Sequence, residues 1–535
     1  MFNYKNYFPY KSIRLEQAQA IDFALDNYIN NDKKFVILEA GTGVGKSAVG
    51  LTVSKYVLDH LGANPGYEKG SYYLTTQKIL QAQYMNDFSS LGMLSLKSSS
   101  NYRCNFYKTK TCQESRRELK VSQDERFKAS CAGGCHYVQD KNRFINGHHG
   151  VTNFPYFMTE INHSGHLPQR QIMVIDECHN IELEMSKFVE VVVTQHFAKS
   201  ILKLKVPELR TQFQVVNWIK KEYIIKLSQV RDKMAKLLEQ QGLKSRLSEF
   251  VSLERKWSMI ESHYSKLKRF LELYDKDNWV MNISTTDARK GKRFEFKPID
   301  IAPYCDQYLF SKADKILMMS ATIMNKEAFC RILGIPKEQT VFISIPSPFP
   351  PENRPIIVSP IAKMGKKDID IGLPKMAAAV KAIIEEHKNE KGIIHCHSYK
   401  IAKYLKENIR SKRLLIHDST NRDKVLFKHC NNPQPTILLS PSMSEGVDLK
   451  GDSSRFQIIC KIPYPYLGDK LVSKRMNKWD WWYSLQTAKT IVQSVGRSVR
   501  SPEDHAVTYI LDAGWNYFWS KNKNIFPKDF NRCIK

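Results

Sequence analysis

The chain is poor in acidic residues, and it lacks both a secretory leader and any long hydrophobic run. Its 535 residues include 82 Lys or Arg against 54 Asp or Glu, which gives a formal net charge of +28. No stretch of about 18 apolar residues occurs, so we expect no membrane span. The start MFNYKNYFPYKSIR has no apolar core of a signal peptide. We therefore expect an intracellular protein with no membrane partner, in the cytoplasm or nucleoid of a prokaryote or a virus-infected cell, with the nucleus as an alternative.

The scarcity of acidic residues also bears on the binding partner. A charge surplus this large favours a polyanion, and nucleic acid is the usual one. A generally basic protein without such a partner is the alternative. Hydrophobic residues make up 42% of the chain and aromatic residues 11%, which suits ordinary cores and argues against extended disorder. A chain of this length should divide into about three or four domains.

A glycine-rich loop follows an apolar run near the N-terminus. FVILEA (35–40) predicts a buried parallel strand, and AVGLTVSKYVLDHLG (48–62) predicts a helix. The loop between them, AGTGVGKS, fits the P-loop pattern, in which backbone N–H groups surround the phosphates of a nucleotide such as ATP. Lys46 is expected to reach the β- and γ-phosphates, and Ser47 to bind Mg²⁺. The expected nucleotide-binding residues of the loop are Gly41, Thr42, Gly43, Val44, Gly45, Lys46 and Ser47.

Two carboxylates follow a second apolar run. RQIMVIDE (170–177) predicts a strand that ends at Asp176 and Glu177, on the sheet edge where open α/β folds bind ligands. Asp176 is expected to bind Mg²⁺ together with Ser47. Glu177 is expected to orient and deprotonate the water that attacks the γ-phosphate. His179 could relay the nucleotide state to a neighbouring domain, or it could be a solvated loop histidine.

Two arginines near the C-terminus complete the candidate nucleotide site. QSVGRSVR (493–500) places Arg497 and Arg500 three residues apart, so they are expected to share one face of a helix. From a second domain they would stabilise charge on the γ-phosphate. Without the other motifs, a basic surface turn would be the preferred interpretation.

Changes of composition divide the chain into two α/β units and two insertions. Strands are expected at 71–76 and 313–322, and strands alternate with helices again from residue 392 onward. Apolar spacing from Tyr223 to Leu271 predicts two antiparallel helices, and five prolines in 346–355 predict a linker. The expected divisions are 1–100, 146–183 and 301–345 for the first α/β unit, 101–145 for a cysteine insertion, 184–300 for a helical insertion and 346–535 for the second α/β unit.

The cysteine insertion holds four of the eleven cysteines, at positions 104, 112, 131 and 135. A disulfide frame does not suit an intracellular chain. Four ordinary buried thiols would need a core, and this polar segment is not expected to form one. Four thiolates suit either zinc or a [4Fe–4S] cluster, and residue types alone do not separate the two.

With these motifs together, the chain resembles superfamily 2 helicases, and within them the XPD/DinG family. DECH (176–179) is typical of that family, and other similar motifs follow in the family's order along almost the whole chain. They are PYKSIRLEQ (9–17, Q motif), YLTTQKILQAQ (73–83, motif Ia), MSATI (319–323, motif III), GIIHCHSY (392–399, motif IV), SEGVDLKGD (444–452, motif V), KIPYPYLGD (461–469) and QSVGRSVR (motif VI).

The resemblance implies ATP hydrolysis coupled to 5′→3′ movement on single-stranded DNA and unwinding of forked duplex by a monomeric motor. It implies two RecA-like motor domains that hold ATP between them, with an iron–sulfur domain and a helical arch domain inserted into the first. Arg14, Gln17 and Gln493 would contact the nucleotide. The residues that would couple ATP hydrolysis to movement are His179, Ser320, Thr322, Gly446 and Asp448. The residues that would contact DNA are Thr75, Thr76, His397, Ser398 and Ser444.

The cysteines lie between motif Ia and DECH, where XPD/DinG relatives carry a [4Fe–4S] centre. The resemblance therefore implies a structural cluster on Cys104, Cys112, Cys131 and Cys135, bracing a small, otherwise coreless domain near the point where strands part. Here the closest pair is the last one rather than a middle pair, which leaves open which ligand takes which corner. Only eight residues precede the Q motif, so we expect no N-terminal exonuclease domain of the kind some relatives have.

Three other functions fit parts of the pattern. A double-strand translocase or protein remodeller would hydrolyse ATP without separating strands. An RNA helicase of the same superfamily would respond to RNA rather than DNA. A non-catalytic ATP-binding adaptor is disfavoured because Lys46, Asp176, Glu177, Arg497 and Arg500 are all intact.

Overall fold

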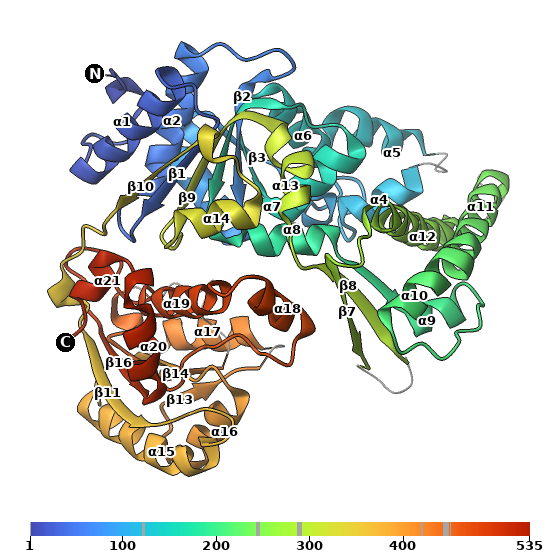
Figure 1. Ribbon diagram of the computed structural model, residues 1–535. Coiled ribbons are helices and arrows are strands. Elements are labelled where there is room, and N and C mark those ends of the chain that lie inside the picture. Colours follow the sequence, from blue (N-terminus) through green and yellow to red (C-terminus); the bar gives the residue numbers. More distant parts are fainter. Residues whose placement is uncertain are drawn as a thin grey trace.

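Two parallel sheets, one in each half of the chain, organise the molecule and lie one above the other in Figure 1. The structure is a computed structural model that describes residues 2–119, 124–241, 247–285, 291–418, 421–441, 449 and 451–535. Within those ranges no helix is long and apolar enough to cross a lipid bilayer.

The first sheet carries the P-loop and the DECH motif. Its strands are β1 (Phe35–Ala40), β2 (Glu68–Thr75), β3 (Met93–Ser95), β4 (His149–Asn153), β5 (Arg170–Asp176), β9 (Ala313–Ser320) and β10 (Thr340–Ile345). Their order across the sheet is β10-β1-β9-β5-β2-β4-β3. Alternate residues of β1 belong to different core clusters, Phe35 and Ile37 to one and Val36 and Leu38 to the other. Both faces of the sheet are therefore covered, which is why residues 35–38 of β1 and 172–175 of β5 are all apolar.

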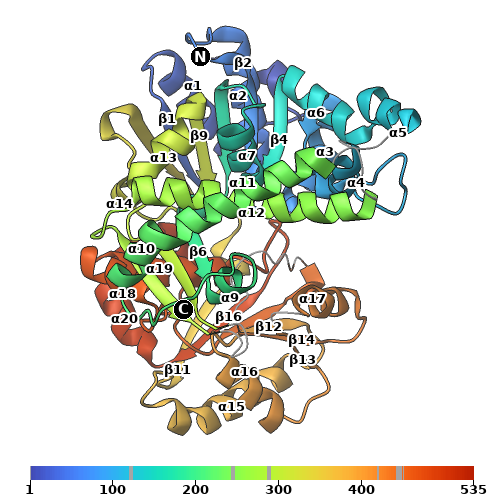
Figure 2. The same cartoon turned by 90° about the vertical axis from the view of Figure 1, so that its right-hand side faces the viewer.

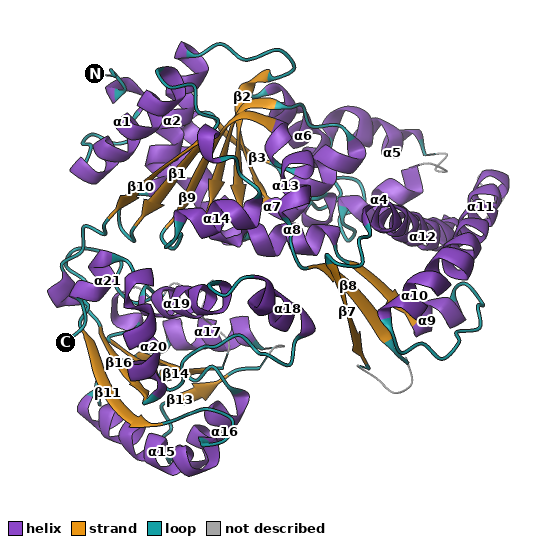
Figure 3. Ribbon diagram, viewed as in Figure 1, coloured by secondary structure: helices purple, strands orange, loops and turns teal. Residues whose placement is uncertain are grey.

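Helices of the first unit cover these two faces (Figure 3). They are α1 (Leu15–Ile29), α2 (Lys46–His60), α3 (Lys78–Phe88), α7 (Phe154–Thr159), α8 (Ile181–Val189), α13 (Ala302–Tyr308) and α14 (Lys326–Leu333). The strand, loop and helix expected around the P-loop are thus present as β1, residues 41–45 and α2.

The second sheet lies in the C-terminal half. Its strands are β11 (Ile356–Ala362), β12 (Gly392–His395), β13 (Leu414–Ile416), β14 (Ile437–Ser440), β15 (Phe456–Ile459) and β16 (Val507–Asp512), in the order β11-β16-β15-β12-β14-β13. Its helices are α15 (Ile369–Glu386), α16 (Tyr399–Asn408), α17 (Arg422–Asn431), α18 (Lys470–Lys478), α19 (Trp482–Val495), α20 (Gly514–Asn522) and α21 (Lys528–Arg532).

The cysteine segment leaves the first sheet after β3 and returns at β4. It contains α4 (Cys112–Leu119), α5 (Glu125–Ala129) and α6 (His136–Asn146). The expectation that this segment lacks a core is wrong. Phe127, Tyr137 and Phe144 are buried, and aromatic side chains around Phe127 pack on one another. The polar composition concealed a few well-placed aromatic residues.

The second insertion contains the expected antiparallel helix pair, α11 (Ile224–Gln241) and α12 (Leu247–Leu273), which projects from the body in Figure 1 and crosses it in Figure 2. Two short helices precede the pair, α9 (Gln195–Ser200) and α10 (Gln212–Trp218). The insertion also contains an unexpected antiparallel sheet of β6 (Val191–Thr194), β8 (Arg293–Pro298) and β7 (Trp279–Ser284). Its signal is the alternation in RFEFKP, where Phe294 and Phe296 are buried.

Helix α18 of the second unit docks against this antiparallel sheet and α8. Arg475 is buried and donates hydrogen bonds to the carbonyl oxygens of Ile299, at 2.8 Å, and Pro298, at 3.4 Å. Its guanidinium also pairs with Glu182 on α8. The two units therefore meet through polar contacts made by a helix of the second and by elements close to DECH.

Candidate nucleotide site between the two sheets

The P-loop connects β1 to α2 in the way the motif predicts. Gly43 and Gly45 have φ angles of +91° and +85°, a region that side-chain-bearing residues rarely adopt. Each glycine also has a close neighbour. A Cβ atom at Gly43 would lie 2.2 Å from the ring of Phe349, and one at Gly45 would lie 2.5 Å from Nε2 of Gln17. Both the backbone and the packing thus require glycine.

The linker after β10 runs along the P-loop. The backbone N–H of Gly41 donates to the carbonyl oxygen of Ile345 at 3.0 Å, and Ser347 Oγ donates to the carbonyl oxygen of Thr42 at 2.7 Å. The buried ring of Phe349 then packs near Gly43 and belongs to a small apolar cluster with Val499 and Ala506 of the second unit. The proline-rich segment is therefore more than a spacer, because it joins the P-loop to the second unit.

The expected nucleotide contacts Arg14 and Gln17 support the same loop from the other side. The Arg14 guanidinium donates to the carbonyl oxygens of Gly43 and Val44, at 2.8 and 3.4 Å. Gln17 is buried, and its Oε1 accepts from the backbone N–H of Arg14 at 3.0 Å. The start of α1 thus holds the P-loop in shape.

The two carboxylates lie at the carboxyl end of β5, beside the P-loop lysine. Lys46 Nζ is 3.9 Å from Glu177 Oε1. Burial and the neighbouring Glu177 charge raise the pKa of Asp176 to about 6. Burial also disfavours the charge on Glu177, but the nearby charges of Lys46, His179 and Arg497 hold the pKa of Glu177 well below its usual value. Glu177 is therefore ionised near neutral pH.

His179 connects DECH to the strand that precedes motif III. Its Nδ1 lies 2.7 Å from Ser320 Oγ and 3.3 Å from Glu177 Oε2. Ser320 Oγ also accepts from the backbone N–H of Thr322 at 3.1 Å, and Thr322 Oγ1 accepts from Gln493 Nε2 at 3.3 Å. A chain of hydrogen-bonded groups thus leads from Glu177 to α19, and the solvated-loop interpretation of His179 does not describe its surroundings.

The expectation that Arg497 and Arg500 lie on one helix face is wrong. Helix α19 ends at Val495 and Gly496 is its C-cap, so both arginines lie beyond the helix, with Arg497 in a turn. Arg497 Nε donates to the carbonyl oxygen of Gln493 at 3.0 Å, and the backbone N–H of Arg500 donates to Asp504 Oδ2 at 3.2 Å. The Arg497 charge still acts on Glu177 from the second unit.

Comparisons with known proteins agree with this geometry. The model for a helicase C-terminal domain matches residues 381–532, and the model for the res subunit of type III restriction enzymes matches residues 10–206. The ATP-dependent DNA helicase DinG of Photobacterium profundum is 28% identical over 244 residues, which are 41% of this chain and 34% of DinG. The matched part thus spans about a third of that relative's length.

Three further matches cover all or nearly all of the chain. The ATP-dependent DNA helicase YoaA of Haemophilus influenzae is 21% identical over an alignment of 636 residues, covering 100% of this chain and 96% of YoaA. A solved XPD helicase structure superposes with a TM-score of 0.65 at 16% identity, covering 98% of this chain and 100% of that one. The structure of S. tokodaii Xpd4 superposes with a TM-score of 0.59 at 14% identity, covering 98% of this chain and 99% of that one. Together these matches support an XPD/DinG-like helicase of superfamily 2. Its two parallel sheets are the RecA-like sheets of that fold.

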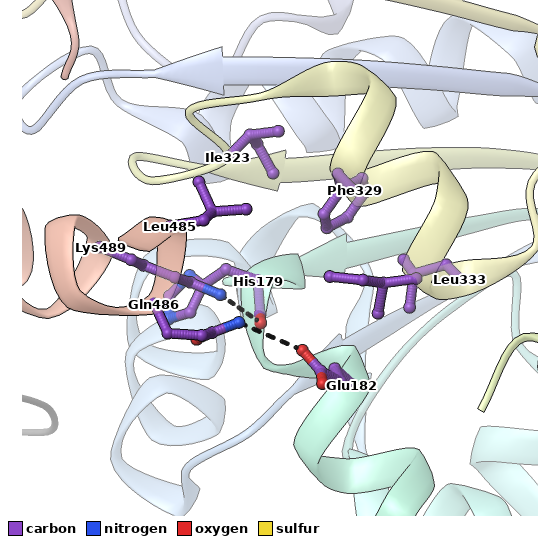
Figure 4. A pocket seen from close by; sticks show the side chains of 9 residues that line it. His179, Glu182, Ile323, Phe329, Leu333, Leu485, Gln486 and Lys489 are labelled. Atoms are coloured by element: carbon purple, nitrogen blue, oxygen red, sulfur yellow. Dashed lines mark hydrogen bonds between the residues drawn. The ribbon is translucent and has the colours of Figure 1, made fainter. Parts of the chain in front are cut away.

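A pocket lies between DECH and α19 (Figure 4). Lys489 Nζ donates to the carbonyl oxygen of His179 at 3.0 Å, and Gln486 Nε2 donates to Glu182 Oε2 at 3.4 Å. The same helix carries Gln493 at its C-terminal end. The second RecA-like unit is therefore bonded to the backbone of DECH itself. The pocket is lined by His179, Glu182, Ile323, Phe329, Ile332, Leu333, Leu485, Gln486 and Lys489.

The expected DNA contacts of the helicase differ in accessibility. Thr75 is fully buried and its hydroxyl donates to the carbonyl oxygen of Gln77 at 3.2 Å, whereas Thr76 is half-buried. Ser398 caps α16, and its Oγ accepts from the backbone N–H of Ile401 at 3.5 Å. His397 is half-buried and has a φ of +47°. The expected motif V residues, Ser444, Gly446 and Asp448, lie outside the described residues.

The four cysteines of the helicase lie close together in the segment between β3 and β4. Cys104, Cys112 and Cys135 are buried and Cys131 is half-buried. Cys112 and Cys135 share a side-chain hydrogen bond, and Cys131 interacts with Cys104 and Cys135. In the described part of the chain no three His, Cys, Asp or Glu side chains are arranged to hold a metal ion. The donor chemistry nevertheless fits a soft metal centre, because four thiols are gathered in one small unit.

The sequence motifs did not reveal several residues of the nucleotide site. Phe349 and Ser347 follow β10 and contact the P-loop only because β10 pairs with β1. Tyr84 donates a hydrogen bond to Asp176 Oδ2 at 3.2 Å from helix α3. A tyrosine within an amphipathic helix carries no local signal of such a contact, so only the folded arrangement identifies it.

Proposed function

We propose that the protein is an ATP-dependent DNA helicase that moves 5′→3′ on single-stranded DNA and unwinds duplex at a fork. ATP would be hydrolysed in the cleft between the two RecA-like sheets. The observation that carries the proposal is the convergence of three groups on this cleft. Lys46 and Glu177 come from the first sheet, and the Arg497 charge acts on Glu177 from the second.

Each residue would have a distinct task in hydrolysis. Lys46 would bind the β- and γ-phosphates as a point charge, while the P-loop N–H groups surround them. Glu177, ionised at neutral pH, would orient the attacking water and accept its proton. Arg497 would add positive charge where the γ-phosphate becomes most negative, and its turn allows that contact to depend on the approach of the second unit.

A divalent cation fits beside these groups. Ser47 and Asp176 supply oxygen donors, which Mg²⁺ prefers, and both hydrogen-bond to the same tyrosine hydroxyl, so they lie next to each other. Mg²⁺ bound there would neutralise charge on the β- and γ-phosphates. This pairing supports the assignment of Ser47 and Asp176 as its protein ligands.

Coupling to DNA would run through the contacts between the two units. Hydrolysis would alter the position of α19, because Lys489 and Gln493 bind the DECH and motif III segments directly. Motif Ia and motif IV stand at the carboxyl ends of β2 and β12, one on each sheet, so opening and closing the cleft would change their spacing along a strand. The net charge of +28 supports a nucleic-acid substrate.

We further propose that Cys104, Cys112, Cys131 and Cys135 hold a [4Fe–4S] cluster with a structural task. When bound, it would cross-link four points of a segment that is otherwise held by short helices. Zinc would serve the same mechanical purpose, so iron analysis and a visible spectrum of anaerobically purified protein decide between the two.

Strand separation on tailed duplexes tests the proposal. Anaerobically purified protein with ATP and Mg²⁺ should unwind a duplex with a 5′ single-stranded DNA tail and leave the matching 3′-tailed and blunt duplexes intact. ATPase activity without unwinding of any substrate would favour a translocase or remodeller. Preference for an RNA tail would identify an RNA helicase. Lys46→Ala serves as the control that excludes a contaminating activity.

A further inference from the structure

Tyr84 is a buried tyrosine of α3 whose hydroxyl lies between two residues of the nucleotide site. Its relative exposure is 2%, and its ring packs against Tyr73 and Phe88. Its hydroxyl is 3.2 Å from Asp176 Oδ2, and it also hydrogen-bonds to the side chain of Ser47. None of the helicase motifs includes this residue.

Simple chemistry fixes the direction of these two hydrogen bonds. An ionised Asp176 carboxylate can only accept, so Tyr84 must donate its single proton to Asp176. The tyrosine oxygen can then only accept, so the hydroxyl of Ser47 must donate to Tyr84. The chain therefore runs from Ser47 Oγ–H to the Tyr84 hydroxyl and from there to Asp176 Oδ2.

The direction of these hydrogen bonds leaves oxygen lone pairs of Ser47 and Asp176 available to a cation. Because the Ser47 proton is directed at Tyr84, the lone pairs of Ser47 Oγ are left for another partner. The carboxylate of Asp176 is fixed at both oxygens, since Oδ1 accepts from the backbone N–H of Glu177 at 3.0 Å while Oδ2 accepts from Tyr84. Each carboxylate oxygen keeps a lone pair. Two oxygen donors are thus oriented before any cation arrives.

We propose that Tyr84 is a positioning residue that orients Ser47 and Asp176 for Mg²⁺. The inference rests on the proposed ATP site and extends it to a residue outside its motifs. Helix α3 begins at Lys78, two residues after Thr76, the half-buried expected DNA contact of motif Ia. A DNA strand that displaces the start of α3 would therefore also disturb Ser47 and Asp176, because the Tyr84 side chain connects the helix to both.

A phenylalanine at position 84 removes the hydroxyl and keeps the ring. The matched control is Tyr73→Phe. Tyr73 is equally buried on β2, contacts the Tyr84 ring, and shares a hydrogen bond with Ser54, which lies on α2 like Ser47 but away from the carboxylates. Each variant loses two buried hydrogen bonds of a tyrosine hydroxyl, to Ser47 and Asp176 in one case and to Ser54 and Ser71 in the other, so any general effect on stability should be similar in the two.

The readout is binding of a fluorescent ADP analogue with and without Mg²⁺, which needs neither hydrolysis nor DNA. In the unmodified protein Mg²⁺ should tighten binding. In Tyr84→Phe this Mg²⁺-dependent gain should fall by about 10-fold, the usual cost of losing a group that orients metal ligands, while affinity without Mg²⁺ stays the same. Tyr73→Phe should keep the full gain. An unchanged gain in Tyr84→Phe, or an equal loss in both variants, overturns the proposal.

If Tyr84→Phe folds poorly, a second measurement still tests the proposal. Fluorotyrosine placed at position 84 should change its ¹⁹F resonance when Mg²⁺ is added to the ADP complex, whereas the same label at position 73 should not. Equal responses at both positions would contradict the proposal. Failure of strand unwinding would count against the proposed helicase activity and not against this inference, because neither measurement depends on unwinding.

Discussion

The nucleotide site and the cysteine segment are attached to the same sheet but are held in place differently. Asp176 and Glu177 stand at the end of β5, and Lys46 begins α2 directly after the loop that follows β1. Both strands lie inside the sheet and are buried along their length. The four cysteines lie on short helices and turns inserted between β3 and β4 at the sheet edge. Cys112 and Cys135 share a hydrogen bond, and burial raises the pKa of Cys112 to about 12.

This difference separates a site that is formed before its ligand from one that depends on it. The sheet orders the nucleotide-binding residues through backbone hydrogen bonds, so losing a ligand should leave their arrangement intact. The four thiols, three of them buried, have no comparable frame, and a metal centre would supply the missing cross-links. Variants in the two regions should therefore fail in opposite ways.

The largest effect is expected for Lys46→Ala. Removing the charge on the β- and γ-phosphates should lower the rate of ATP hydrolysis by at least about 100-fold, with thermal stability and single-strand binding largely retained. Lys55→Ala, on the same helix α2 and half-buried, is the matched control and should leave hydrolysis unchanged. If Lys46→Ala fails to fold, formation of the nucleotide site depends on the Lys46 charge.

Cys112→Ser should instead weaken the cysteine segment and leave ATP hydrolysis intact. Loss of one thiolate should reduce bound iron from about four atoms per chain to nearly none and abolish the visible absorption. The segment 101–145 should become sensitive to protease, because only its small aromatic core remains to hold it. ATP hydrolysis in the absence of DNA should persist, since β1 and β5 are untouched.

Cys330→Ser is the control for this variant, because Cys330 is a buried thiol on α14 outside the segment. It should retain iron and protease resistance. Stoichiometric zinc and no iron in the unmodified protein would refute the cluster assignment. Loss of basal ATP hydrolysis in Cys112→Ser would show that the nucleotide site depends on the cysteine segment, contrary to this prediction.

The same contrast explains what could be predicted from the sequence. The P-loop and DECH are short local patterns whose backbone conformation follows from their own residues, so the sequence indicates where Lys46 and Glu177 lie, while their roles in hydrolysis stay predictions. The arginine turn was misjudged because Gly496 ends α19 before Arg497. The β6–β8–β7 sheet was missed because its short alternating segments are far apart along a helix-rich stretch.

Other residues could not be predicted from local sequence at all. Tyr84 meets Asp176 because β2, which leads into α3, lies beside β5 in the sheet. Phe349 meets Gly43 because β10 pairs with β1 in parallel, from Phe35 with Thr340 to Ala40 with Ile345, and the chain continues along the P-loop. Both contacts depend on strand order, which becomes known only when the fold is known.

Phe349→Ala tests how far the linker contributes to the preformed nucleotide site. The ring is 3% exposed and joins Gly43 to Val499 and Ala506. Its removal should cost about 3 kcal/mol of stability and raise the KM for ATP by several-fold, because Gly43 loses the contact that confines it. Phe157→Ala, in the core beside Tyr72, should cost similar stability with an unchanged KM. Equal KM values in both variants would mean that the P-loop is held by the sheet alone.

The smallest effect concerns His149, at the start of β4 where the chain returns from the cysteine segment. Its Nδ1 lies 2.8 Å from Ser71 Oγ on β2. Burial lowers its pKa to about 4, helped by the positive charges of Lys55, His148 and Arg170 and opposed by Asp59. The unfolded chain therefore binds a proton between pH 6.5 and 4 that the folded chain does not, so stability falls as the pH is lowered through this range.

Since His149 is partly exposed, the expected loss from pH 7 to pH 5 is about 1 kcal/mol. Urea unfolding at the two pH values measures it, and His149→Gln should remove most of the difference. Hydrogen exchange at pH 5 should show protection falling first in β4 and α6, while β1 keeps its protection. A uniform loss across the sheet would mean that the junction is no weaker than the nucleotide site, and the contrast between the two regions would then rest on the metal centre alone.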